Sequence, residues 1–230
     1  MEKFRQTWIL LLLALGCSLL GCSETAGRKG VLPDLARMND PRYVIGVPQG
    51  AAAMTVVERK YPRCRITYHS SLHDGFLAVK YGKIDAFAFD RHTLQYVLLR
   101  NPDLALMDEK IADEQIVVGT APGREALMAQ INRFIKQYRA DGTYRDMYNR
   151  WILGENPTMP DLPEPRHPSL HLNIGTDGVN EPMSFFKDGR LTGFDIEFAR
   201  RLALFLNAGI TLHTVEFPAI ITAAATGKID

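Results

Sequence analysis

The chain has 230 residues, of which 27 are lysine or arginine and 26 are aspartate or glutamate, so its formal net charge is only +1. No basic run is long enough to follow a phosphate backbone, which argues against nucleic acid and favours a small molecule or a protein as the partner. Three cysteines are too few for a disulfide framework, so a hydrophobic core has to stabilise the fold.

The first 22 residues have the pattern of an export signal. Lys3 and Arg5 precede an apolar run over 8–15, which is short for a membrane span and typical of a signal-peptide core. The sequence Leu-Leu-Gly-Cys that ends at Cys22 resembles the bacterial lipobox, which implies cleavage and a lipid anchor on that cysteine. The alternatives are an ordinary cleaved signal and an uncleaved anchor, and all three interpretations predict export. We therefore expect a lipoprotein of the periplasm or cell surface, anchored in the membrane, with a tether over 23–42.

Strands and helices alternate in the first segment, 43–153. The predicted strands are 43–47, 64–68 and 84–89, and the predicted helices are 50–61, 72–81 and 91–101. This alternation indicates parallel strands with helical crossovers, an α/β layer. Apolar residues at helical spacing predict two more helices, one on either side of Asp141-Gly142.

Five prolines between 154 and 169 follow this segment. Each proline removes an amide donor and restricts the residue before it, so neither a helix nor a central strand can run through the stretch. Beyond this stiff linker, the second segment, 170–230, again alternates strands and helices. Its predicted elements are a strand at 170–174, a hairpin at 183–190, a helix at 194–206, a strand at 210–215 and a helix from Pro218 to Gly227.

The sequence Gly-Lys-Ile-Asp occurs twice, at 82–85 and at 227–230. Glycine adopts the left-handed conformation without penalty, so each copy is predicted to end a helix and start a strand. The second segment supplies only two or three strands, which are too few for a self-sufficient layer. We therefore expect Asp230 to be the end of a fragment or of a truncated gene.

Several stretches resemble the bacterial extracellular solute-binding proteins of family 3, the amino-acid receptors of ABC importers. Residues 174–205, IGTDGVNEPMSFFKDGRLTGFDIEFARRLALF, are similar to the family's first lobe, and 217–230 are similar to the helix and strand that follow it. Residues 43–152, with IGVPQG, GKIDAFAFD, NPDL and ADGTYRDMYNRW, are similar to the second lobe. The resemblance implies an α/β, two-lobed periplasmic-binding-protein-like fold of type II, with the second-lobe pattern first and the first-lobe pattern incomplete.

The order of the two lobes differs from the family's usual order. A circularly permuted receptor explains this order, and so does a half-receptor that precedes a second, complete one. Similar lobe-swapped receptors occur fused ahead of a transporter permease, so membrane helices are one expected continuation.

An amino acid in a closed cleft needs anions for its ammonium and donors for its carboxylate, because both groups leave water. Asp90 and Asp177 match family positions that contact the ligand, and each follows a predicted strand, where α/β sheets bind ligands. From the residues alone, Asp90 is alternatively a helix N-cap and Asp177 a turn residue. The free amides at Gly50, Ala51 and Ala52 are the expected site for the carboxylate.

Other features limit the choice of solute. The family usually has hydroxyl residues after the glycine at 50, where this chain has alanines and therefore only backbone donors. Asn180 and Met183 stand where the resemblance places aromatic rings over the ligand, so stacking is reduced. His69 and His73 are four residues apart but belong to different predicted elements, and we predict neither a metal nor a cofactor.

The resemblance implies the extracytoplasmic solute-binding component of an ABC transporter, and not an enzyme. Such a receptor closes two lobes around a small polar solute, here an amino acid or a related zwitterion, and delivers it to the permease. The alternatives are a same-fold module of a periplasmic enzyme, either a lytic transglycosylase or a protein like cyclohexadienyl dehydratase, and a module of a sensor kinase. Catalysis needs a positioned acid or base with a perturbed pKa, and the sequence singles out none.

Overall fold

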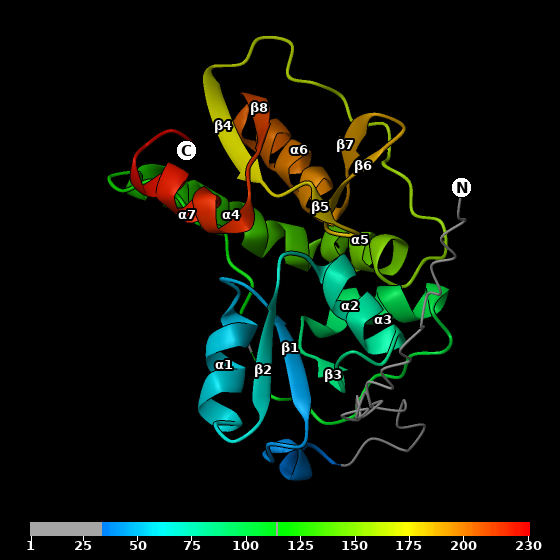
Figure 1. Cartoon of the computed structure of the whole chain (residues 1–230). Helices are drawn as coiled ribbons and strands as arrows, with labels where there is room; N and C mark the ends of the chain where they lie inside the picture. Colours follow the sequence, from blue (N-terminus) through cyan, green and yellow to red (C-terminus); the bar gives the residue numbers. More distant parts are fainter. Residues whose placement is uncertain (1–33, 114) are drawn as a thin grey trace, which may run out of the picture. The chain divides into compact units, whose positions relative to one another are not determined.

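The computed structural model describes residues 34–113 and 115–230, and Figure 1 labels its helices and strands. The expected signal sequence, the lipidation at Cys22 and most of the expected tether lie outside these residues. At the end of the expected tether, the 3-10 helix η1 (Leu35–Met38) buries Leu35 and Met38 against the first sheet. In the described part of the chain, no helix is both long and apolar enough to cross a membrane.

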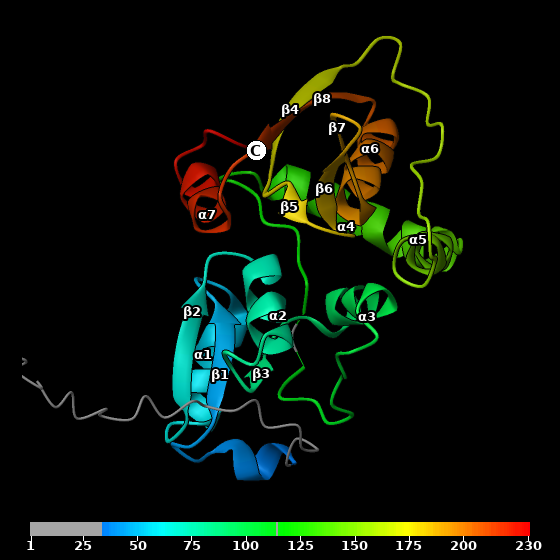
Figure 2. The ribbon, with the colours of Figure 1, turned by 45° about the vertical axis from the view of Figure 1, so that its right-hand side comes forward.

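Three parallel strands form the first sheet, in the order β2-β1-β3. The elements are β1 (Val44–Pro48), α1 (Ala52–Lys60), β2 (Arg65–His69), α2 (Leu72–Lys80), β3 (Ala86–Phe87) and α3 (Arg91–Arg100). Because β2 and β3 lie on opposite sides of β1, right-handed crossovers place α1 and α2 on opposite faces of the sheet, as Figure 2 shows. The predicted alternation is confirmed, although β3 is shorter than the predicted strand.

The second segment contains a parallel pair and a small antiparallel sheet. Strands β4 (Leu170–Thr176) and β8 (Ala208–Thr214) pair along their full length. Between them lie β5 (Val179–Asn180), β6 (Ser184–Lys187), β7 (Arg190–Thr192) and α6 (Phe194–Leu206), and α7 (Phe217–Ala225) follows β8. Helix α6 has the bounds that its apolar periodicity predicted.

Helices α4 (Glu125–Ala140) and α5 (Thr143–Trp151) pack against α6 (Figure 1). Their apolar faces meet in one core cluster, which consists of Ile131, Phe134, Tyr138, Met147, Trp151, Ile152, Phe185 and Leu202. The sequence placed α4 and α5 in the segment 43–153, yet Phe185 and Leu202 belong to 170–230. The proline-rich stretch 154–169, which carries no helix or strand, therefore joins two parts of a single core.

A buried carboxylate fixes α5 against α6. Glu197 of α6 is completely buried and accepts hydrogen bonds from Arg150 Nη1 at 2.6 Å, Trp151 Nε1 at 2.6 Å and Arg201 Nε at 2.8 Å. Burial raises the pKa of this carboxyl, but the hydrogen bonds outweigh burial, so the pKa lies below its ordinary value. Because two of the three donor residues come from α5, the carboxylate is satisfied only when α5 docks in this position.

Both copies of Gly-Lys-Ile-Asp end a helix in the same way. Gly82 and Gly227 have φ angles of 66° and 71°, in the left-handed region that glycine adopts without penalty. The chain then turns back, and the side chains of Ile84 and Ile229 are buried, with exposed fractions of 7% and 8%. The glycine therefore stops the helix, and the isoleucine returns the chain to the core.

The aspartate of each copy binds the first strand of its own segment. Asp85 N donates to Val44 O at 3.0 Å, and the Asp85 carboxylate accepts from Val44 N at 2.8 Å. Asp230 N likewise donates to Asn173 O at 2.8 Å, and its carboxylate accepts from Asn173 N at 2.8 Å. The repeat is thus a structural motif that attaches a new chain segment to the edge of a parallel strand.

Candidate functional site

The carboxyl end of β4 carries the first of the predicted aspartates. Asp177 directly follows β4, is half-buried, and accepts a hydrogen bond from Val179 N at 3.4 Å. Burial raises the pKa of Asp177, and backbone N–H groups of the same turn oppose that rise. Ser184 Oγ holds the turn in place, because it accepts from Thr176 Oγ1 at 2.6 Å and from Gly178 N at 3.1 Å.

A second carboxylate, Asp195, lies in the first turn of α6, close enough to Asp177 for the charge of Asp177 to affect its pKa. The pKa of Asp195 is raised to about 7, first by burial and then by the negative charge of Asp177. Asp195 is nevertheless exposed to solvent and is not part of the core. Asp195 N donates to Met183 O at 2.9 Å, which ties the loop before β6 to the start of α6.

Sequence reasoning missed Asp195 as a site residue. The signal was present, because Asp195 is the aspartate of the Gly-Phe-Asp stretch that begins α6. Its position in the first turn of a helix had an ordinary explanation, since acidic residues favour the helix N-terminus. Only the fold shows that Asp177, 18 positions earlier, carries a like charge close enough to change its ionisation.

Asn180 and Met183 lie between Asp177 and Asp195 along the chain, Asn180 as the last residue of β5 and Met183 just before β6. Asn180 Oδ1 is buried and has no hydrogen-bond partner within the described residues. Because an unsatisfied buried acceptor is unfavourable, this oxygen favours a ligand or solvent donor in the loop. The Met183 side chain is partly buried and packs against the core cluster that α4, α5 and α6 share, and its contact with a ligand stays a prediction.

The other predicted residues, Asp90, Gly50, Ala51 and Ala52, lie in the first segment, after strands of the first sheet. Asp90 occupies the N-cap position of α3, as the alternative from the residues predicted, although its side chain makes no cap hydrogen bond. Gly50, Ala51 and Ala52 lead into α1, and a Cβ atom on Gly50 would lie 3.2 Å from Pro218 Cγ at the start of α7. The structure therefore brings the start of α1 next to α7. That Asp90 and Asp177 bind one ligand together stays a prediction.

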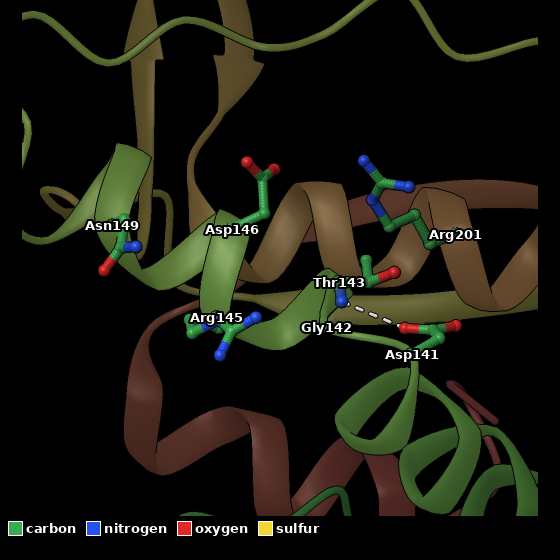
Figure 3. A pocket seen from close by; sticks show the side chains of 7 residues that line it. All are labelled: Asp141, Gly142, Thr143, Arg145, Asp146, Asn149 and Arg201. Atoms are coloured by element: carbon green, nitrogen blue, oxygen red, sulfur yellow. Dashed lines mark hydrogen bonds between the residues drawn. The ribbon is translucent and has the colours of Figure 1, made fainter.

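Two cavities open elsewhere on the described surface. The first, of about 500 Å³, lies at the turn between α4 and α5, and its lining side chains are shown in Figure 3: Asp141, Gly142, Thr143, Arg145, Asp146, Asn149 and Arg201. Asp141 accepts from Thr143 N at 2.9 Å, and Arg201 is already bound to Glu197. The second, of about 390 Å³, runs from Thr120 to Asn132. None of the predicted ligand-binding residues lines either cavity.

The predicted histidine pair has separate neighbours. His69 Nε2 lies 3.1 Å from Thr67 Oγ1, and the ring of His73 packs edge-on against Phe76. Across residues 34–113 and 115–230, no three His, Cys, Asp or Glu side chains are grouped in a way that could hold a metal ion.

Comparison with known proteins identifies relatives for part of the chain. Residues 172–230 match the family described as bacterial extracellular solute-binding proteins, family 3. ABC transporter arginine-binding protein 1 of Escherichia coli (strain K12) is 26% identical over 113 residues, which are 47% of this chain and 46% of that protein. ABC transporter glutamine-binding protein GlnH of Bacillus subtilis (strain 168) is 26% identical over 104 residues, which are 45% of this chain and 38% of that protein.

A solved structure has a partial likeness to the chain. The ancestral amino acid-binding protein AncCDT-1, described as a precursor of cyclohexadienyl dehydratase, matches with a TM-score of 0.43 at 22% identity, over 50% of this chain and 48% of that chain. This chain spans less than half the length of each of the two curated relatives, with shares of 46% and 38%.

Proposed function

We propose that this chain is the solute-binding component of an ABC transporter, because residues 172–230 match the family described as bacterial extracellular solute-binding proteins, family 3, as their resemblance predicted. The proposed solute is an amino acid or a related zwitterion, and the proposed partner is a transporter permease. The names of the curated relatives, which are arginine- and glutamine-binding proteins of ABC transporters, support a receptor. Export and the lipid anchor at Cys22 are also part of the proposal and rest on the sequence pattern alone.

The observation that carries this proposal is the pair of carboxylates at Asp177 and Asp195. Burial and like charge raise the pKa of Asp195 to about 7, so keeping both groups ionised is unfavourable in the free protein. A cation bound between them offsets this repulsion, because an opposite charge favours the ionised form. Asn180 Oδ1, which is buried without a partner in the described residues, adds a neutral acceptor to the same loop.

The remaining predicted residues complete a site for a charged amino acid. In this proposal Asp90 contacts the α-ammonium, and the backbone amides at Gly50, Ala51 and Ala52 receive the carboxylate. Asp177 and Asp195 then receive a second cationic group. This arrangement favours L-arginine over L-glutamine, because only arginine carries a guanidinium with five donors.

One observation favours a second candidate, an enzyme on the same scaffold. A carboxyl with a pKa of about 7 is suited to proton transfer at neutral pH, and Asp195 is such a group at a solvent-exposed position. The receptor is nevertheless the first candidate, because a cation site explains the paired carboxylates and the curated relatives are named as binding proteins of ABC transporters.

A thermal-shift titration of the full chain tests the receptor proposal. We expect L-arginine to raise Tm with increasing concentration, with stabilisation of about 2.7 kcal/mol at a hundredfold excess over Kd. N-acetyl-L-arginine, which lacks the α-ammonium, is expected to have a much smaller effect. Asp177→Asn should abolish the shift, whereas Asp188→Asn, in the exposed turn after β6, should keep it.

The absence of any shift with L-arginine and with L-glutamine would contradict the receptor proposal. An unchanged shift in Asp177→Asn would contradict the assigned site. Conversion of the added amino acid, followed by NMR, would favour the enzyme.

A further inference from the structure

Helix α3 carries a row of polar side chains that bind later parts of the chain. His92, Tyr96 and Arg100 are spaced four residues apart, so they lie along one face of the helix. Each forms a hydrogen bond to a residue far along the sequence, at separations of 56, 85 and 55 positions respectively. The helix therefore docks onto the later segments through one polar face.

Tyr96 makes the central contact of this row. Its hydroxyl donates to Glu181 Oε1 at 2.5 Å, although Tyr96 is only 3% exposed. The guanidinium of Arg100 lies over the Tyr96 ring, 4.0 Å from its centroid. Burial raises the pKa of Tyr96, and the hydrogen bond to Glu181 raises it further, so the phenol keeps its proton and acts as the donor. A buried donor without this acceptor would be unfavourable.

The two outer contacts of the row reach other segments. Tyr148 Oη of α5 lies 2.9 Å from His92 Nδ1, and the two rings pack edge-on. Arg100 Nη2 donates to the backbone oxygen of Glu155, in the proline-rich stretch, at 3.1 Å. The three contacts thus involve α5, the stretch 154–169 and the loop 181–183 between β5 and β6. Three attachments on separate segments fix the orientation of α3 more firmly than one attachment could.

Both ends of this connection carry residues of the candidate site. Asp90 is the N-cap residue of α3, and its backbone oxygen accepts from Leu94 N at 3.0 Å. Glu181 directly follows Asn180, whose buried Oδ1 has no partner within the described residues. Met183 N donates to Asn180 O at 2.7 Å, which closes the loop 181–183 into a tight turn. One helix and one hydrogen bond therefore connect Asp90 to the neighbourhood of Asn180.

We propose that α3 couples the two halves of the candidate site, with Tyr96 and Glu181 holding the loop 181–183 at a position that α3 sets. Tyr96 is a positioning residue in this role, because it acts on Asn180 through Glu181 and does not contact the solute. A site whose two halves are held at a fixed spacing loses less freedom when a solute binds to both. This consequence for affinity rests on the proposed function, whereas the coupling itself does not.

Hydrogen exchange of the full chain without any solute tests the coupling. Tyr96→Phe keeps the buried ring and removes only the hydroxyl, so we expect the Met183 amide to exchange about tenfold faster. The amides of α6 should keep their rates, because α6 makes none of the three contacts. The matched control is Tyr81→Phe, which removes the hydroxyl of a tyrosine that is 69% exposed at the end of α2 and should leave the Met183 amide unchanged.

Variants of Glu181 test whether the same hydrogen bond is responsible. Glu181→Ala should accelerate exchange at Met183 as much as Tyr96→Phe does, and the double variant should show no further acceleration, because both changes remove one contact. Glu181→Gln retains an acceptor oxygen and should restore most of the protection. Titration with L-arginine then tests the consequence for affinity, with Kd expected to rise about tenfold in Tyr96→Phe and to stay unchanged in Tyr81→Phe.

Three exchange results would overturn the coupling. They are an unchanged Met183 amide in Tyr96→Phe, acceleration of equal size throughout α6, and additive effects of Tyr96→Phe and Glu181→Ala. Faster exchange at Met183 with an unchanged Kd for L-arginine would overturn the consequence for affinity. If the unmodified chain bound neither L-arginine nor L-glutamine, the proposed function would fail, whereas the exchange results would still decide the coupling.

Discussion

Asp195 and Glu197 are two residues apart on α6, yet the fold gives the two carboxyl groups opposite properties. Residues i and i+2 point roughly 200° apart around a helix, so the Glu197 side chain enters the core while Asp195 lies on the exposed side. Glu197 meets three donor residues, and its pKa is lowered despite complete burial. Asp195 meets a second carboxylate, and burial together with that charge raises its pKa to about 7. The neighbouring groups therefore give the two carboxylates different roles: Glu197 stabilises the fold, and Asp195 is the one that we propose for a ligand.

The raised pKa of Asp195 predicts how stability depends on pH. Between the ordinary value of 3.8 and about 7, the folded chain holds the Asp195 proton more tightly than the unfolded chain does. The contribution of this group to stability is therefore largest at low pH and falls as pH rises through that window. We expect Asp195→Asn to remove this part of the slope of Tm against pH, measured by calorimetry from pH 4 to 8. Asp188→Asn should keep the slope, and an unchanged slope in Asp195→Asn would contradict the assignment.

Glu197→Gln is predicted to be strongly destabilising. The substitution leaves Arg150 and Arg201 without the carboxylate that they share, and breaking a buried ion pair typically costs about 3–5 kcal/mol. The free energy of unfolding in urea measures this loss. The matched control is Asp146→Asn, which removes an exposed partner of Arg150 and should cost under about 1 kcal/mol. Equal losses in the two variants would show that the buried network does not hold α5 in place.

At the level of helices and strands, the sequence predicted most elements because their signals are local. Glycine at the end of a helix, proline in a linker and apolar periodicity each act within a few residues, and the bounds of α6 were predicted correctly. β3 is shorter than predicted at both ends, and the first two of its predicted residues belong to the Gly-Lys-Ile-Asp turn, where Asp85 bonds to β1 through its side chain as well as its backbone. The buried oxygen of Asn180 had no signal in the sequence, because its environment depends on how β5 and β6 fold together.

The repeat itself is open to a direct test in its first copy. Asp85→Ala removes a carboxylate that accepts from Val44 N at 2.8 Å and leaves that partly buried amide without its partner. Hydrogen bonds to charged groups are worth about 1.5–3 kcal/mol, so we expect a loss of this size in urea unfolding. Lys83→Ala, at an exposed position of the same turn, should change stability by less than about 0.5 kcal/mol. A loss for Asp85→Ala as small as that of the control would refute the structural role of the motif.

At the level of the whole chain, the sequence showed which segments exist but not which segments share a core. α4 and α5 were grouped with the first segment because no linker signal separates them from it, whereas their apolar residues pack with Phe185 and Leu202 of the second. The contact that fixes this arrangement joins Arg150 to Glu197, which are 47 positions apart. Single-sequence periodicity carries no information on such pairs. The candidate site follows the same rule: Asp177 was predicted from its match to a family position and its place after a strand, and only the fold added Asp195.

Isothermal titration of the full chain with L-arginine at pH 7, in two buffers that differ in ionisation enthalpy, tests the cation site most directly. A cation between Asp177 and Asp195 must lower the pKa of Asp195 from about 7, so we expect saturable binding with proton release. Asp195→Asn should abolish the proton release. Binding without any proton release, or the same release in Asp195→Asn, would contradict the cation site, and the absence of binding would contradict the proposed function itself.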